Sequence, residues 1–128
     1  MLNAGLAVYI YSTITVFAVL FQLALAAGVP WGEYAMAGRF PGRFPVRMRI
    51  GAGIQATILI LFALIVASRS GLYLSSWNQT SQSFIWLVVF ISASSLLLNL
   101  ITPSKWERII WAPVAMLMLW CSLSVAMQ

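Results

Sequence analysis

The sequence predicts an all-α integral membrane protein, a single domain in which four transmembrane helices form an antiparallel, up-and-down bundle. Two observations support this prediction. Hydrophobic residues make up 62% of the 128 positions and charged residues only 7%, whereas soluble domains carry about a quarter charged residues. The apolar residues also gather in four runs long enough to cross about 30 Å of hydrocarbon. We place these runs at residues 4–27, 46–67, 84–102 and 105–127.

The first run ends at a helix-stop signal, in which Gly28 is followed by Pro30. Glycine accepts a left-handed backbone after the last helical turn, and proline cannot continue the hydrogen-bond ladder. Tyr9 and Tyr11 lie near the outer end of this run, where we expect amphipathic rings at the membrane interface. Gln22 is the one strongly polar side chain of the run, and we expect it to bond a neighbouring helix.

The second run begins with small residues, which allow another helix to approach closely. These residues are Gly51, Ala52, Gly53 and Ala56. Gln55 adds a polar contact at the same level, and the run ends at Arg69 to Gly71. The following segment, 72–83, is polar but uncharged, and Tyr73 and Trp77 indicate that it lies along the interface.

The third run is the most polar of the four. Ser95 and Asn99 are four positions apart, so they share a helix face that should turn towards protein and not towards lipid. After Pro103, the residues from Ser104 to Glu107 fit a capping box at the start of the fourth run. Pro113 lies inside that fourth run, where it should kink the helix or end a short interfacial turn before the true span.

The basic residues predict the orientation of the bundle. The first connection and the start of the second run hold Arg39, Arg43, Arg47 and Arg49, and the third connection holds Lys105 and Arg108, against Arg69 alone in the second connection. Basic residues favour the cytoplasmic side of a membrane. We therefore expect the first and third connections in the cytoplasm and both termini outside.

The first connection is the candidate binding site, because it is long for a helix hairpin. It is also rich in glycine, proline, aromatic residues and arginine. Its candidate residues are Trp31, Glu33, Tyr34, Arg39, Arg43, Arg47 and Arg49. The arginines have three possible roles: anchoring the topology at anionic headgroups, converging on a phosphate or carboxylate of a lipid or solute, or docking a partner protein. For Glu33 the alternatives are an ion pair with a nearby arginine and a proton-carrying role.

The same connection resembles a family of small bacterial membrane proteins. The residues that carry the resemblance are Gly28-Val29-Pro30-Trp31-Gly32, Ala35, Gly38, Pro41-Gly42, Pro45 and Arg49, with Ala37 where a second glycine is usual. The resemblance covers the connection closely and the four-span layout loosely. It implies a location in the bacterial inner membrane and brings no activity with it.

Several chemistries are disfavoured by composition. The chain has no histidine and one cysteine, Cys121, so the usual zinc-ligand sets cannot form within it. We expect no metal, no cofactor, no catalytic residue and no nucleic acid partner; membrane lipids, a second copy of the chain or another membrane protein are the expected partners. Three functions stay open. The first is binding of a lipid or apolar ligand, or assistance to a membrane complex; the second is a small transporter or channel that would be dimeric. The third is an enzyme at the cytoplasmic face using Glu33 or Glu107 with arginines and tyrosines.

Three structural observations would separate these functions. A polar cavity that crosses the bundle would favour transport, and a groove that opens sideways to lipid would favour ligand binding. A pocket shared by Glu33, Tyr34 and the arginines would favour an enzyme. The intramembrane polar residues Gln22, Gln55, Ser95 and Asn99 are the candidates for lining a polar path.

Overall fold

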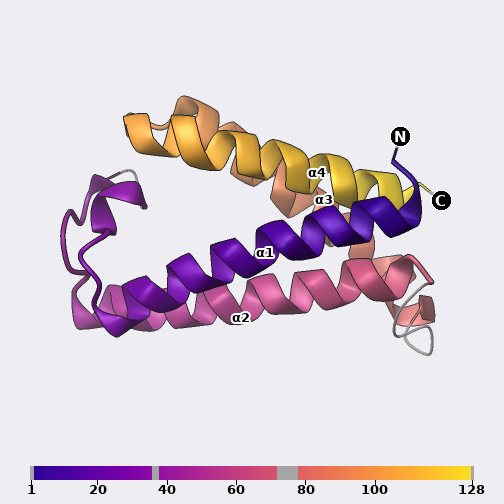
Figure 1. Ribbon diagram of the computed structural model, residues 1–128, viewed down its shortest axis with the longest axis horizontal. Coiled ribbons are helices and arrows are strands. Elements are labelled where there is room, and N and C mark those ends of the chain that lie inside the picture. The colour runs from indigo at the N-terminus through magenta and orange to yellow at the C-terminus, as the bar shows by residue number, and fades with distance from the viewer. Residues whose placement is uncertain (1, 36–37, 72–77, 128) are drawn as a thin grey trace.

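The computed structural model describes residues 2–35, 38–71 and 78–127, and this part of the chain is helical apart from its connections. Four of its helices are long and apolar enough to cross a membrane, which confirms the predicted all-helical class and is compatible with a multi-pass membrane protein. In chain order the elements are α1 (Ala4–Ala27), the short 3-10 helix η1 (Gly32–Tyr34), α2 (Val46–Arg69), α3 (Asn78–Ile101), the π-helical η4 (Glu107–Trp111) and α4 (Ala112–Ala126) (Figure 1).

The four helices form two pairs, α1 with α2 and α3 with α4, which meet at one end and diverge towards the other (Figure 1). Both termini lie at the narrow end, and the connection 28–45 lies at the wide end together with the turn before η4. At the narrow end Ser81 Oγ donates a hydrogen bond to Ser68 Oγ at 3.1 Å, and Arg69 Nη2 donates to the carbonyl of Ala126 at 3.4 Å. These contacts tie the end of α2 to the opposite pair.

The main hydrophobic core fills the narrow end, and a smaller cluster lies at the wide end. The smaller cluster joins Leu25 of α1, Ala52 of α2 and Phe44 of the connection. Large apolar side chains elsewhere point outward, among them Phe17 and Phe90. The main core consists of Ala7, Val8, Tyr11, Val66, Ile85, Val88, Met118, Cys121, Val125 and Ala126.

The ends of α1 follow from its flanking residues. Asn3 Oδ1 accepts a hydrogen bond from the Leu6 N–H at 2.8 Å, which satisfies one of the free amides of the first turn. Gly28 ends the helix in the left-handed conformation, with φ of 97°, and its N–H bonds the last turn. The predicted stop at this glycine is confirmed.

Alanines, not glycines, form the close contact predicted for the start of α2. Ala52 and Ala56 are almost completely buried, whereas a Cβ added at Gly51 or Gly53 would meet nothing within 4 Å. On a helix, residues 52 and 56 share one face and residues 51 and 53 lie to either side of it. The alanine face makes the close contact, and the glycines do not.

The third helix begins at Asn78, six positions before the predicted start at residue 84. Residues 78–83 are polar, so hydropathy gives no sign of them, yet they contain neither glycine nor proline to stop a helix. The helix therefore extends beyond its apolar part. Tyr73 and Trp77, which we expected at the interface, lie outside the described residues, as does Ala37 of the loop motif.

The fourth helix starts near the predicted position, but the hydrogen bonds of its cap and the turn before Pro113 differ from the prediction. The Glu107 N–H donates to Ser104 Oγ at 3.5 Å, as a capping box requires, but the Ser104 N–H donates to Thr102 Oγ1 at 3.2 Å. The helical path continues through Pro113, which stands in the first turn of α4, and the widened π-helical turn of η4 ends two residues before it. In a regular α-helix the proline ring would meet the carbonyl of Ile109, and the wider turn relieves that clash.

Candidate functional site

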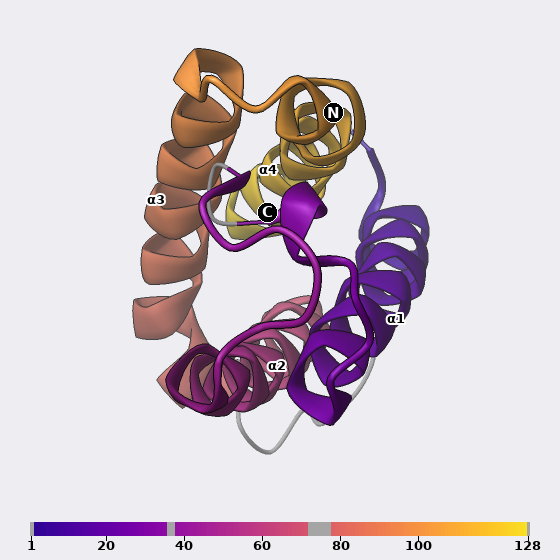
Figure 2. The same cartoon turned by 90° about the vertical axis from the view of Figure 1, so that its left-hand side faces the viewer.

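A cavity of about 620 Å³ lies between the two helix pairs, towards the wide end of the bundle. All four long helices contribute to its wall, and the connection 28–45 contributes Ala35 and Phe44. Figure 2, which looks at the wide end, shows that this connection runs across the end of the space between the helices. The site is thus a chamber inside the apolar part of the protein with the connection as its cap.

The chamber is closed on the side of the termini. Its deepest wall includes Tyr11, Phe62 and Met118. Tyr11 and Met118 also belong to the main core, which fills the narrow end beyond them. Within the described residues the cavity therefore stops part of the way along the bundle and does not cross it.

The chamber opens sideways between α2 and α3. Four of its lining residues on these helices are exposed on the outside of the bundle. The two helices meet at the narrow end through Ser68 and Ser81 and separate towards the wide end (Figure 2). The exposed lining residues are Gly51, Gln55, Ile58 and Ile91.

Each long helix, or the π-helical turn leading into it, contributes one long polar side chain to the wall. These are Gln22 from α1, Gln55 from α2, Asn99 from α3 and Glu107 from η4. Ser92 and Ser95 of α3 add two hydroxyl groups. At 1.5 Å per residue, these groups lie within about 14 Å of the wide ends of their helices. The long polar side chains therefore lie towards the cap, whereas the depth is lined mainly by apolar groups, with the Tyr11 and Ser92 hydroxyls among them.

The amides that we expected to join helices face this space. Within the described part of the chain, the side chains of Gln22 and Gln55 form no hydrogen bond, so the predicted bond from Gln22 to a neighbouring helix is absent. Asn99 Nδ2 donates to the Ser95 carbonyl at 2.8 Å, one turn earlier in α3. Ser95 and Asn99 share one helix face, as predicted, and that face borders the cavity.

Glu107 is placed in the wall by η4. It is 8% exposed and begins the π-helical turn, whose last residue, Trp111, also lines the cavity. A π-helical turn costs backbone energy and is frequent at functional sites. From the sequence, Glu107 is a capping residue and one of the two acids open to an enzyme, but its place in this cavity was not predicted. The available signal was an acidic residue at the start of an apolar run, six positions before Pro113.

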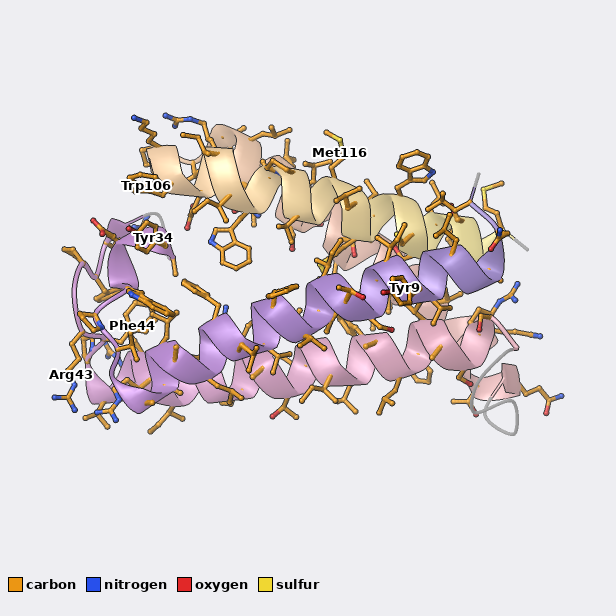
Figure 3. The ribbon with its side chains drawn as sticks, in the orientation of Figure 1. Tyr9, Tyr34, Arg43, Phe44, Trp106 and Met116 are labelled. Atoms are coloured by element: carbon orange, nitrogen blue, oxygen red, sulfur yellow. The ribbon has the colours of Figure 1, made fainter. Side chains whose placement is uncertain are left out.

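Tyr11 occupies a position that the sequence analysis misjudged. Tyr9 is exposed on the outer surface of α1 (Figure 3), but Tyr11 is completely buried at the deep end of the cavity. Residues two positions apart lie about 200° apart around a helix, so both rings cannot face lipid. Ser92 lies beside the Tyr11 hydroxyl, yet within the described chain no group has hydrogen-bond geometry to it.

In the described part of the chain, aromatic side chains and a hydrogen bond from Trp111 attach the cap to both helix pairs. Trp111 Nε1 donates to the backbone carbonyl of Tyr34 at 2.8 Å. The ring of Phe21 stacks on Trp31 with centroids 6.2 Å apart, and it also contacts Trp111 at 4.9 Å. Tyr34 meets Trp106 edge-to-face at 5.3 Å. Such aromatic pairs contribute about 0.5–1.5 kcal/mol beyond their buried area.

Gly32 closes the cap by a close backbone contact. Its N–H donates to the carbonyl of Gly42 at 2.8 Å. A Cβ on Gly32 would lie 1.8 Å from the carbonyl oxygen of Phe40, far inside van der Waals contact. Only glycine allows the two arms of the connection to approach this closely.

The arginines of the connection lie outside the cavity wall. Arg39, Arg43 and Arg47 are exposed. Figure 3 shows Arg43 at the wide end and Phe44 pointing inward, and the Arg43 guanidinium lies against Gly28 at the end of α1. Arg49 Nε donates to the carbonyl of Ala26 at 2.8 Å, which joins the start of α2 to the end of α1. The structure does not gather the four arginines around one pocket.

Glu33 lies on the surface of the cap, beside Tyr34. Among the described residues it forms no ion pair with Arg39 or Arg43, so the expected pairing is absent. The neighbouring Glu33 carboxylate, more than burial, raises the pKa of the Tyr34 phenol. Glu33, Tyr34 and the arginines therefore share no cavity.

Comparison with known proteins identifies no relative: no family model, curated protein or solved structure matches this chain.

Proposed function

We propose that this protein resides in a cell membrane, with its wide end on the cytoplasmic side, and that it binds a lipid or another amphipathic ligand in the chamber between its helix pairs. One observation carries the proposal: a chamber of about 620 Å³ that opens sideways between two outward-facing apolar helices, with its long polar side chains towards the cap and mainly apolar groups at its depth. Ligand pockets typically measure about 300–1,000 Å³ and combine apolar walls with a few polar groups.

The sideways opening supports a ligand that arrives from the bilayer. The opening lies along α2 and α3, whose outer surfaces carry exposed Ile54, Leu61 and Phe90. These surfaces are apolar enough to face acyl chains, so an amphiphile can enter without crossing water. A charged solute that lacks an apolar chain would have to leave water to reach the same rim, which disfavours it.

The alternatives receive less support. A transport path would cross the bundle, whereas the core at the narrow end blocks the chamber within the described residues. An enzyme using Glu33 would need that carboxylate beside a substrate pocket, whereas Glu33 is exposed on the outside of the cap. The proposal also includes the bacterial inner membrane, on the strength of the loop resemblance and the basic wide end.

Native mass spectrometry of the protein, extracted in a nonionic detergent together with its lipids, tests the proposal. Gly51→Leu adds a side chain at the rim of the chamber, where a Cβ meets nothing within 4 Å. Gly53→Leu is the matched control, because its Cβ also meets nothing and it does not line the chamber. We expect a bound amphiphile on the wild type and on Gly53→Leu, and its loss from Gly51→Leu. Equal occupancy in all three would contradict the proposal.

A further inference from the structure

The charged group in the chamber wall is negative. Among the described residues, Glu107 is its single charged lining residue, and no lysine or arginine contributes to the wall. The nearest arginine in sequence, Arg108, is exposed and donates to the carbonyl of Thr102, outside the chamber. A carboxylate held in an apolar chamber disfavours an anion beside it and favours a cation.

The other polar groups of the wall can accept hydrogen bonds. Because the Nδ2 of Asn99 donates to the Ser95 carbonyl, its Oδ1 is left as an acceptor. The Gln22 amide also borders the chamber without a partner among the described residues. An ammonium group has three donors and no acceptor, so a carboxylate with amide oxygens suits it well.

The gradient of polarity sets the direction of a bound amphiphile. Glu107 starts η4 at the wide end, and Asn99 lies within about 3 Å of the wide end of α3 along the helix axis. Phe62 and Met118 line the depth, which is mainly apolar apart from the Tyr11 and Ser92 hydroxyls. A head group near the cap and a chain pointing towards the narrow end would match both regions.

From this arrangement we infer that the ligand of the chamber is a cationic amphiphile, a long-chain amine whose ammonium group is held by the Glu107 carboxylate with Gln22 and Asn99 near the cap. This inference rests on the proposed function and specifies its ligand class. It differs from the anionic ligand that was one of the three roles considered for the arginines, because the chamber wall presents an acid.

The test compares three probes of equal chain length, dodecylamine, dodecanol and dodecanoate, titrated near neutral pH into the full-length protein in a nonionic detergent. Native mass spectrometry gives the apparent Kd of each, and Gly51→Leu measures binding outside the chamber. We expect dodecylamine to bind the wild type about tenfold or more tightly than dodecanoate, the size expected for a hydrogen bond to a charged group.

Two variants test whether the preference for dodecylamine over dodecanoate comes from the Glu107 carboxylate. Glu107→Gln should remove the preference for dodecylamine and leave dodecanol binding unchanged, whereas Glu33→Gln, the same change on the cap surface, should leave the preference intact. A wild-type preference for dodecanoate, or an unchanged preference in Glu107→Gln, would overturn the inference. Because the wild-type comparison needs no variant, poor folding of Glu107→Gln does not block the test.

The outcomes also separate this inference from the proposed function. If the three probes bind equally and Gly51→Leu blocks them all, the chamber is a ligand site and only the inference about charge fails. If Gly51→Leu weakens none of them, the chamber is not the binding site and both proposals fail.

Discussion

Trp111 Nε1 donates a hydrogen bond to the backbone carbonyl of Tyr34 across 2.8 Å, and this bond joins the cap to the helix pair that does not carry it. The connection 28–45 links α1 and α2 in sequence, whereas Trp111 belongs to the turn that leads into α4. The bond therefore connects the two helix pairs at the end where they diverge. In this way the cap fixes the distance between the pairs on either side of the chamber.

Trp111→Phe tests this bridge, because phenylalanine keeps an aromatic ring beside Phe21 but has no N–H. We expect a loss of about 1 kcal/mol in the free energy of unfolding, since the Tyr34 carbonyl loses its donor. Denaturation by dodecyl sulfate, followed by circular dichroism, measures it. Trp120→Phe is the matched control, because Trp120 is exposed on the outer surface. Equal loss in both variants would mean that the bond contributes nothing specific.

Gly32→Ala should destabilise the cap. The added methyl group would overlap the Phe40 carbonyl oxygen, so the two arms of the connection must separate. We expect a cost of about 1–3 kcal/mol, as for other overpacked sites. Gly53→Ala lies inside a helix with open space around its Cβ, so it should be neutral or stabilise by up to about 1 kcal/mol. Thermal unfolding of the two variants compares them, and a neutral Gly32→Ala would refute the close contact.

Arg49 and Arg47 should differ in their effect on stability although they are two residues apart. Arg49→Gln removes the bond to the Ala26 carbonyl that joins α1 to α2, and we expect a loss of about 1.5–3 kcal/mol, typical of a hydrogen bond to a charged group. Arg47→Gln removes an exposed charge and should change the unfolding free energy by less than about 0.5 kcal/mol. Similar losses for the two, by thermal unfolding, would rule out a specific role for Arg49.

The phenol of Tyr34 should ionise at a higher pH than an ordinary tyrosine, because the Glu33 carboxylate raises its pKa. The folded state then holds this proton more tightly than the unfolded state. Its contribution to stability is complete below the ordinary pKa of about 10 and is lost as the pH rises through the raised value.

Ultraviolet difference spectra across an alkaline titration report the ionisation of the tyrosines. The difference between the wild type and Tyr34→Phe gives the part of the signal that comes from Tyr34. Glu33→Gln should shift that part towards lower pH, because the neighbouring negative charge is gone. An unshifted titration in Glu33→Gln would show that the carboxylate does not act on the phenol.

The sequence predicts the helices well because each apolar run can be recognised from its own length and composition. The stop at Gly28 and the four helices long enough to span a membrane follow from local chemistry. The early start of α3 at Asn78 does not, because a polar helix extension looks like a connection when hydropathy is the only guide.

The candidate site is harder to predict, because it depends on which helix faces meet. The spacing of Ser95 and Asn99 predicts their common face, but not that the face borders a chamber. The arginines drew attention through their number, and yet the packing leaves them outside the wall. Glu107 looked like a helix cap, and only the π-helical turn before Pro113 explains its place in the cavity.

The most direct test of the account is whether the chamber admits the chain of an amphiphile. A variant that retains Trp111 as its sole tryptophan reports from the chamber wall, and it can be placed in vesicles of a phosphatidylcholine with brominated chains, which quench tryptophan on contact. The account predicts strong quenching that Gly51→Leu relieves and Gly53→Leu does not. Quenching that is absent, or equally strong in Gly51→Leu, would contradict it.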